Sequence, residues 1–141
     1  MDRSDRTPLA LSICIQHHPA RAHLLDALRE RLPDAELVVD PDPDSEHRSP
    51  FRTYLECLRC TPADATHRLI VQDDAWPCSN FRERVEARTA EYPEALIPLF
   101  VPGTAEMGRQ FRKRPDAGDR WRQVPAGWLP TVALVWPVEL A

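Results

Sequence analysis

The sequence predicts an α/β domain of three layers, in which helices cover both faces of a mostly parallel central sheet. Three observations predict it. Apolar, β-branched runs alternate along the chain with segments whose apolar residues recur at helical spacing. The length of 141 residues suits one domain with a core of its own. Polar residues gather where the first three expected strands end, which is the ligand-binding edge of open α/β sheets.

The first half of the chain contains two expected strands and two expected helices. Residues 9–15 form an apolar run that predicts a buried strand, and residues 20–32 repeat leucine at helical spacing. Residues 36–39 predict a short second strand. Pro50 opens the next helix at a position that proline tolerates, with Ser49 as the expected cap. The expected buried positions are Leu24, Leu25, Leu28 and Leu32 in the first helix and Phe51, Tyr54, Leu55 and Leu58 in the second.

The second half continues the alternation of strands and helices. Asn80 is the expected cap of a helix that ends near Glu91, with Glu83 at the capping-box position. Residues 137–140 resemble the start of another helix, so the domain is expected to be truncated or minimal. The further expected strands are residues 68–72, 95–101 and 131–136.

Composition argues against several classes of protein. The N-terminus is charged and shows no signal-peptide pattern, and no apolar run approaches the length of a membrane span. The four scattered cysteines are too few for a disulfide framework, so we expect a cytoplasmic, reduced protein. The first strand is followed by no glycine-rich fingerprint, and no serine lies in a nucleophile elbow. A P-loop, a Rossmann dinucleotide site and a serine hydrolase are therefore disfavoured.

Two adjacent carboxylates, Asp73 and Asp74, directly follow the third expected strand. Two like charges repel each other unless a cation lies beside them. Mg²⁺ sites commonly combine one or two protein carboxylates with substrate phosphates, so the pair predicts a divalent metal and a diphosphate. The alternative is a pair of turn residues before Pro77. The buried strand that precedes the pair favours the metal site.

Two further polar loops are expected at the same edge of the sheet. His18, Pro19 and Arg21 follow the first strand, where helix amides and an arginine can hold a phosphate. Asp40 ends the second strand, where a carboxylate can accept hydrogen bonds from a nucleobase or a ribose. The alternatives are a polar turn with a surface arginine and an aspartate that only ends a strand. The coincidence of three polar loops supports a site more than any single loop does.

A basic stretch lies between residues 103 and 122, although the whole chain has a formal net charge of −4. Basic side chains can contact a phosphate backbone, and neighbouring aromatic residues can stack on a base. The alternative is a solvated loop. The residues that make nucleic acid a candidate partner are Arg109, Arg112, Lys113 and Arg114.

The three polar loops together resemble those of GT-A glycosyltransferases, in particular small family-2-like members of the kind found in actinobacteria and their phages. The resemblance rests on residues 18–21, on Asp40 and on residues 69–81, which are similar to the DXD-type motif and its following helix. It covers roughly residues 9–101, with 131–137 as a later strand. The chain departs from the family in reading Gln-Asp-Asp and in lacking a clear counterpart of the acceptor half with its catalytic base.

The resemblance implies one GT-A-like domain over residues 1–141, with a nucleotide-binding half at 9–101 and a basic loop and last strand at 102–141. It implies a glycosyltransferase that uses a nucleotide-diphospho-sugar donor and Mn²⁺ or Mg²⁺. Asp74 is the expected metal ligand, and Asp73 is expected to share the metal and to face the ribose or sugar. The implied nucleotide-sugar-binding residues are His18, Pro19, Arg21, Asp40 and Asp73.

The acceptor, the catalytic residues and the oligomeric state stay open from the sequence. A modified phage DNA base is one acceptor that the basic stretch allows. Two alternatives belong to other classes of protein. One is a non-catalytic module that binds a nucleotide or nucleotide-sugar, which the short length and the missing base favour. The other is a nucleic-acid-binding accessory protein that uses residues 109–122.

Overall fold

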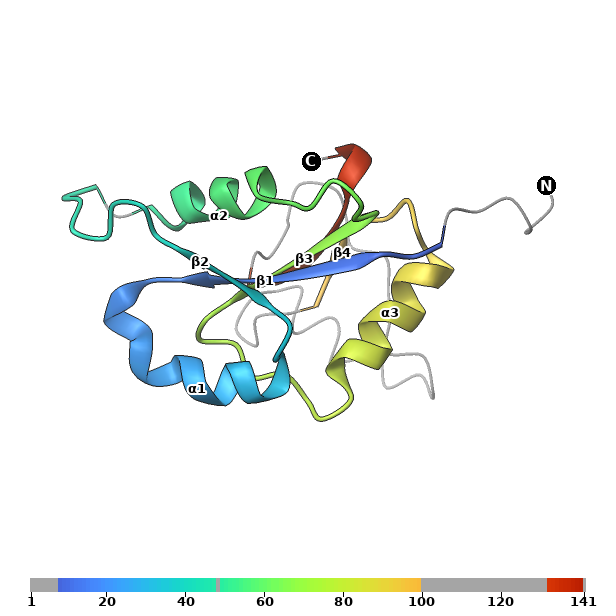
Figure 1. Cartoon of the computed structure of the whole chain (residues 1–141), viewed down its shortest axis with the longest axis horizontal. Coiled ribbons are helices and arrows are strands. Elements are labelled where there is room, and N and C mark those ends of the chain that lie inside the picture. Colours follow the sequence, from blue (N-terminus) through green and yellow to red (C-terminus); the bar gives the residue numbers. More distant parts are fainter. Residues whose placement is uncertain (1–7, 48, 100–131, 141) are drawn as a thin grey trace, which may run out of the picture.

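The structure is a computed structural model that describes residues 8–47, 49–99 and 132–140 (Figure 1). Within these ranges it has one five-stranded sheet and three α-helices, so the predicted α/β class is confirmed. No helix in this part of the chain is long and apolar enough to cross a membrane. The elements in chain order are β1 (Leu11–His17), the 3₁₀ helix η2 (Pro19–Arg21), α1 (Ala22–Arg31), β2 (Glu36–Val39), α2 (Pro50–Arg59), β3 (His67–Gln72), α3 (Phe81–Glu91), β4 (Ile97–Pro98), β5 (Ala133–Pro137) and the 3₁₀ helix η3 (Val138–Leu140).

The sheet is mixed, which corrects the prediction of a mostly parallel sheet. Its strand order is β2-β1-β3-β5-β4. β1 runs parallel to β2 and to β3, whereas β5 is antiparallel to β3 and to β4. The prediction failed at β5 because an apolar run reads the same in either direction. A parallel neighbour needs a crossover connection, and no helix is expected between β4 and β5.

The order of the strands reverses around β1. The chain passes through α1 to β2 on one side of β1, and then through α2 to β3 on the other side. β1 and β3 are in register from Leu11 opposite His67 to Gln16 opposite Gln72, so their carboxyl ends lie next to each other. Open α/β sheets bind ligands outside the strand ends at such a reversal.

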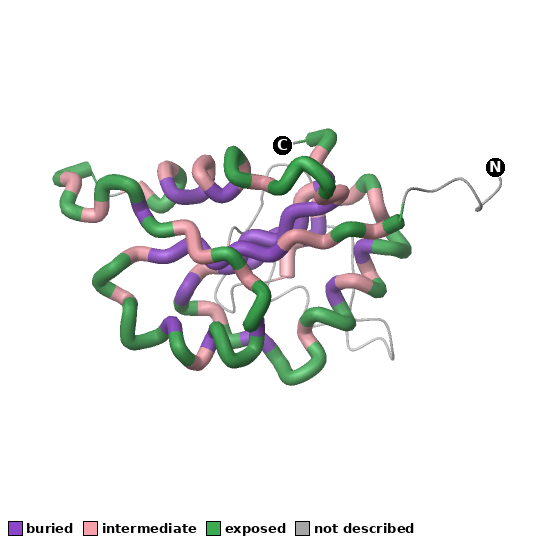
Figure 2. Tube along the Cα trace, viewed as in Figure 1, coloured by how far each residue is buried: buried purple, intermediate pink, exposed green. Residues whose placement is uncertain are grey.

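Helices cover both faces of the sheet, as the sequence predicted. α2 lies on one face, and α1 and α3 lie on the other (Figure 1). Side chains alternate along a strand, so Ile13 and Ile15 pack with residues of α1 and α3, whereas Cys14 packs with residues of α2. Figure 2 shows continuous buried segments in the middle of the sheet, and these belong to β1, β3 and β5.

The buried face of α2 differs from the predicted stripe. Phe51 is 62% exposed, whereas Thr53, Tyr54 and Cys57 are buried. The Tyr54 ring meets the Trp136 ring edge to face at a centroid distance of 6.4 Å, and Trp136 Nε1 donates to the Tyr54 hydroxyl. Cys57 is small enough to bring the helix close to the sheet. The face that α2 buries therefore depends on side-chain shape and on hydrogen bonding. The spacing of large apolar residues alone does not predict it.

The helix starts also differ in detail from the prediction. Ser49 and Asn80 occupy the cap positions of α2 and α3, but neither side chain makes a capping hydrogen bond. The predicted helix at 20–32 begins instead with η2, where Pro19 opens the turn and His18 Nδ1 accepts from the Ala20 amide at 3.2 Å. This turn bends the chain immediately after β1 and so shapes the edge of the sheet.

Arg68 of β3 is fully buried, which the sequence did not predict. Its Nε donates to the carbonyl oxygen of Cys57 at 3.1 Å, and its Nη2 lies 2.7 Å from a carboxylate oxygen of Glu36. A buried charge is tolerated only when it is paired and hydrogen-bonded. Arg68 therefore ties β3 to α2 and to the start of β2. All four cysteines are free thiols in the structure.

Candidate functional site

The two adjacent carboxylates lie directly after β3 and have different surroundings. The side chain of Asp73 is fully buried, whereas that of Asp74 is 45% exposed. Asp73 Oδ2 accepts from the backbone N–H of His18 at 2.9 Å and lies 2.8 Å from Nδ1 of His17. Because an ionised carboxylate only accepts, His17 donates from Nδ1. These contacts join the loop after β3 to the loop after β1.

Arg21 is the cation that lies beside both carboxylates. Its Nε is 2.9 Å from Asp73 Oδ1, and its Nη1 is 2.9 Å from Asp74 Oδ2. The Nη1 contact is a hydrogen bond. The Nε contact is an ion pair without hydrogen-bond geometry, so Asp73 Oδ1 is buried without a hydrogen bond. The guanidinium relieves the repulsion between the adjacent carboxylates.

Asp40 follows β2 and is held by Arg52 of α2, a residue that sequence reasoning missed. Arg52 donates from Nε to Oδ1 at 2.9 Å and from Nη2 to Oδ2 at 3.2 Å. The backbone N–H of Asp42 also donates to Oδ1 at 3.1 Å. The hydrogen bonds from Arg52 are the main reason that the pKa of Asp40 is lowered, and the same pairing raises the pKa of Arg52. Asp40 is therefore ionised and has both oxygens engaged.

A cavity of about 320 Å³ brings the predicted loops together at the carboxyl ends of β1 and β2. His18 and Arg21 line it from the loop after β1, and Asp40 lines it from the loop after β2. Its volume lies at the lower end of the range for small-molecule sites. Asp73 and Asp74 do not line this cavity. They are connected to it through Arg21, which reaches from its wall to both carboxylates.

Several residues of the cavity wall were not predicted as site residues from the sequence, among them Gln16, Arg52 and Thr53. Gln16 is polar and buried, and it directly follows the apolar residues Ile13–Ile15 of β1. That exception in the pattern was a signal that could have found it. Arg52 and Thr53 carry no such signal, because only the folded position of α2 brings them to the loop after β2.

Of the two adjacent carboxylates, Asp74 is the one that fits a divalent metal. Asp74 is half exposed, and its Oδ1 has no partner among the residues that the structure describes. Asp73 fits less well, because its oxygens face His17, the His18 amide and Arg21. Across the described ranges, no group of three or more His, Cys, Asp or Glu side chains is placed to hold a metal ion.

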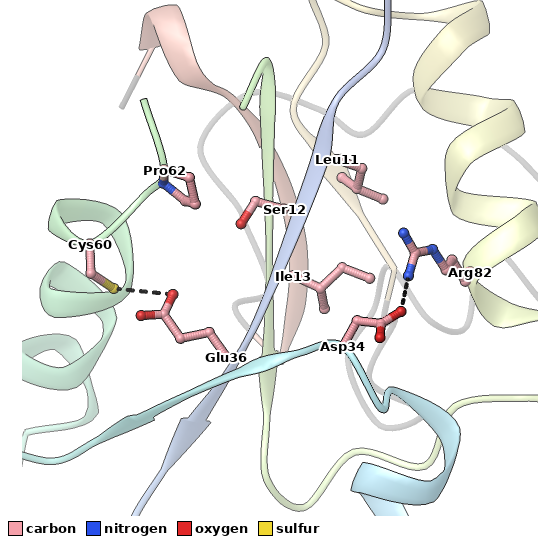
Figure 3. Close-up of a pocket in the computed structure, with 8 residues that line it drawn as sticks. All are labelled: Leu11, Ser12, Ile13, Asp34, Glu36, Cys60, Pro62 and Arg82. Carbon is pink, nitrogen blue, oxygen red and sulfur yellow. Dashed lines mark hydrogen bonds and ion pairs between the residues drawn. The ribbon is translucent and has the colours of Figure 1, made fainter. Parts of the chain in front are cut away.

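A second cavity, of about 350 Å³, lies at the other end of β1 (Figure 3). Its charged side chains already have ion-pair partners. Asp34 lies 3.0 Å from Arg82, and Glu36 lies 2.7 Å from the buried Arg68. None of the predicted site residues lines this cavity, so we place the candidate site at the 320 Å³ cavity. The basic residues Arg109, Arg112, Lys113 and Arg114 lie outside the described residues.

Comparison of the chain with protein-family models, with curated proteins and with solved structures gave no match. The resemblance to GT-A glycosyltransferases therefore stays a prediction. What the geometry establishes is narrower. Two of the three polar loops share one cavity, and Arg21 connects that cavity to the carboxylate pair of the third.

Proposed function

We propose that the protein is a glycosyltransferase that binds a nucleotide-diphospho-sugar donor at the carboxyl ends of β1, β2 and β3. The observation that supports this most is the reach of Arg21 from the cavity wall to Asp73 and Asp74. A nucleotide-diphospho-sugar needs a cavity for its nucleoside and cationic donors for its diphosphate. It also needs carboxylates near the bond that breaks. Among the residues that the structure describes, Arg21 lines the cavity and contacts both carboxylates, whereas His17 and His18 line it and contact Asp73 alone.

The diphosphate would be held at the start of α1. A guanidinium can make paired hydrogen bonds to phosphate oxygens, and the N-terminal end of a ten-residue helix carries the positive end of the helix dipole. His18 lines the same wall and offers its ring beside Arg21. The side chain of Arg21 is 36% exposed, so a ligand can contact it without a rearrangement of the buried core.

Asp74 is the residue that would hold Mn²⁺ or Mg²⁺. The single positive charge of Arg21 faces two carboxylates, so one negative charge is left for a second cation. When bound, the metal would supply a Lewis acid that neutralises the leaving diphosphate. We assign Asp73 a positioning role, because its oxygens hold the loops after β1 and β3 together. Asp73 is therefore not included as a metal ligand in this proposal.

A second candidate function is a non-catalytic module that binds a nucleotide or nucleotide-sugar. The ion pairs of Arg21 favour it, because they already neutralise part of the carboxylate charge and permit binding without a metal. A nucleic-acid-binding accessory role depends on residues 109–122 and stays a prediction from the sequence.

Calorimetry with UDP-, GDP- and other nucleotide-sugars, with and without Mn²⁺, tests the proposal. We expect one donor to bind more tightly with the metal and to release its nucleoside diphosphate when an acceptor is present. Asp74→Asn should remove the metal dependence, and Arg21→Gln should weaken every diphosphate ligand. Asp44→Asn, which changes an exposed carboxylate of the loop after β2, is the matched control.

The outcomes separate the two candidate functions. Absence of binding for every donor, with and without the metal, would contradict both of them. Binding that ignores the metal and the Asp74→Asn change, without release of nucleoside diphosphate, would favour the binding module over the enzyme.

A further inference from the structure

His17, the last residue of β1, has one ring nitrogen engaged and the other free. Its Nδ1 donates to Oδ2 of the fully buried Asp73 side chain at 2.8 Å. Its Nε2 makes no hydrogen bond to any residue that the structure describes. Nε2 is not buried either, because Gln16 Oε1 and Asp73 Oδ1 are the only buried side-chain nitrogen or oxygen atoms without a partner in the described ranges. The His17 side chain is only 7% exposed and the residue lines the 320 Å³ cavity, so we place the accessible nitrogen at the cavity wall.

The contact with Asp73 also determines which nitrogen of His17 carries the proton. The proton lies on Nδ1, because an ionised carboxylate can only accept a hydrogen bond. In the neutral ring, Nε2 then keeps its lone pair and is able to take a proton. A buried carboxylate that holds the Nδ1–H of a histidine is also the arrangement that orients the imidazole base of serine proteases.

His67, at the start of β3, is a histidine whose contacts are all structural. It is as buried as His17, since both residues are 6% exposed. Its Nδ1 lies 2.9 Å from the hydroxyl oxygen of Thr66, and its Nε2 lies 2.7 Å from the carbonyl oxygen of Pro93. Both nitrogens of His67 therefore serve the fold. A structural role alone explains only one of the two nitrogens of His17.

His18 lines the same cavity and is held in the opposite tautomer. Its Nδ1 accepts from the backbone N–H of Ala20 at 3.2 Å, so in the neutral ring the proton lies on Nε2. Two adjacent histidines thus offer different groups, an acceptor on His17 and a donor on His18. The donor suits a phosphate oxygen of the diphosphate, and the acceptor suits a hydroxyl group.

We propose that His17 is the general base that takes the proton from the hydroxyl group that attacks the donor sugar, and that Asp73 is its positioning residue. The inference rests on the proposed function, which holds the diphosphate beside Arg21. Arg21 and His17 both contact Asp73, so the base lies next to the group that binds the diphosphate.

The proposed step is a single displacement. The oxygen of the attacking hydroxyl forms a bond to the anomeric carbon, while the bond from that carbon to the diphosphate oxygen breaks. The electron pair of the broken bond leaves with the diphosphate, and the hydroxyl proton moves to His17 Nε2. Release of this proton to water restores the base.

NMR of the imidazole ¹⁵N nuclei of the full chain tests the tautomers without any ligand. In mildly alkaline solution, where an ordinary imidazole is neutral, we expect His17 to be protonated at Nδ1 alone and His18 at Nε2 alone. In Asp73→Asn the amide is able to donate to the ring, so the His17 proton should move to Nε2. A purely structural Asp73 would leave this proton on Nδ1. A His17 ring that is protonated at Nε2 in the unaltered protein would overturn the base assignment, even if Asp73→Asn does not fold.

His17→Asn is the variant for kinetics, because an asparagine amide can keep the donor to Asp73 but provides no base. His23→Asn, which changes an exposed histidine of α1, is the matched control. Calorimetry and the release of nucleoside diphosphate are measured with UDP-glucose, UDP-galactose and GDP-mannose, with Mn²⁺ and with water as the attacking hydroxyl. We expect His17→Asn to keep the donor affinity and to release the nucleoside diphosphate about 100- to 10,000-fold more slowly. His23→Asn should change neither quantity.

The failure of this inference is distinguishable from the failure of the proposed function. Release by His17→Asn at the unaltered rate would overturn the base assignment and leave the glycosyltransferase standing. A loss of donor affinity with an unaltered rate at saturating donor would do the same, because it would make His17 a binding residue. Donor binding by the unaltered protein without release would overturn the base and the enzyme but leave the binding module. Absence of binding for every donor would overturn the donor site and the base together.

Discussion

Asp73 and Asp74 are neighbours in the sequence, but the fold gives one a buried position and the other a half-exposed one. Asp73→Ala would leave His17, the His18 amide and Arg21 without their shared acceptor. We expect this change to lower the free energy of unfolding by about 3 kcal/mol or more. Asp74→Ala removes one half-exposed partner of Arg21, and we expect a loss of about 0–1 kcal/mol. Urea unfolding followed by circular dichroism measures both, and equal losses would contradict the anchoring role of Asp73.

The Asp40–Arg52 pair predicts a specific dependence of stability on pH. The hydrogen bonds from Arg52 lower the pKa of Asp40 in the folded protein. A group whose folded pKa is lowered stabilises the fold above its unfolded pKa, which is about 4 for aspartate. That stabilisation is lost as the pH falls through the folded pKa. We therefore expect the stability difference between the unaltered protein and Asp40→Asn to be constant near neutral pH and to shrink below about pH 4.

Urea unfolding of the two proteins between pH 3 and pH 7 measures this difference. At pH 3 the protonated Asp40 approaches the neutral asparagine, so the two curves should converge. A difference that stays constant or grows toward pH 3 would mean that the charge of Asp40 does not stabilise the fold.

The sequence identified the residues at the strand ends better than it identified their partners. Asp40, Asp73 and Asp74 were found because carboxylates at the end of an apolar run are unusual. Their partners Arg21 and Arg52 lie in other segments, and only the folded sheet brings them within hydrogen-bond distance. The sequence suggested a metal because two adjacent carboxylates need a cation beside them. In the structure, the cation beside them is the guanidinium of Arg21.

At the scale of the element, α2 separates two aromatic residues that the sequence placed on one buried stripe. We expect Tyr54→Ala to lower the free energy of unfolding by about 3–5 kcal/mol, because it removes a buried ring that packs on Trp136. Phe51 is exposed, and we expect Phe51→Ala to change stability by about 0.5 kcal/mol or less. Chemical denaturation of both variants gives the comparison. Similar losses would indicate that Phe51 is buried and that the predicted stripe was right.

Element types could be predicted because local periodicity determines them, whereas orientation could not. Each expected strand and helix within the described ranges occurs at nearly the expected place, since burial on one face requires a repeat that the sequence shows. The direction of β5 depends on its partners β3 and β4, which are distant in the sequence. The turn of α2 about its axis depends on the fit of Cys57 against the sheet. Neither the direction of β5 nor the rotation of α2 about its axis produces a hydrophobic repeat within its own segment, so neither could be predicted from that segment alone.

At the scale of the whole molecule, the reversal of strand order around β1 brings the polar loops after β1, β2 and β3 to one edge of the sheet. It places the loops after β1 and β3 side by side and lets α2 bring Arg52 to the loop after β2. The general rule for open α/β sheets was therefore enough to predict the edge of the sheet at which these polar loops meet. The rule does not distinguish the loops that line the cavity from the loop that is joined to it through Arg21.

This arrangement predicts that a ligand will stabilise several distant segments at once. A nucleoside diphosphate with Mn²⁺, at a hundred times its dissociation constant, should raise the free energy of unfolding by about 2.7 kcal/mol. Hydrogen exchange followed by mass spectrometry should then show slower exchange at residues 17–21, 40–43 and 73–76 together, because Arg21 links the cavity to the carboxylates. The segment 34–36, beside the opposite cavity, is the internal control and should change only as much as global stability does. Protection confined to one of the three loops, or centred on residues 34–36, would show that the loops do not act as one site.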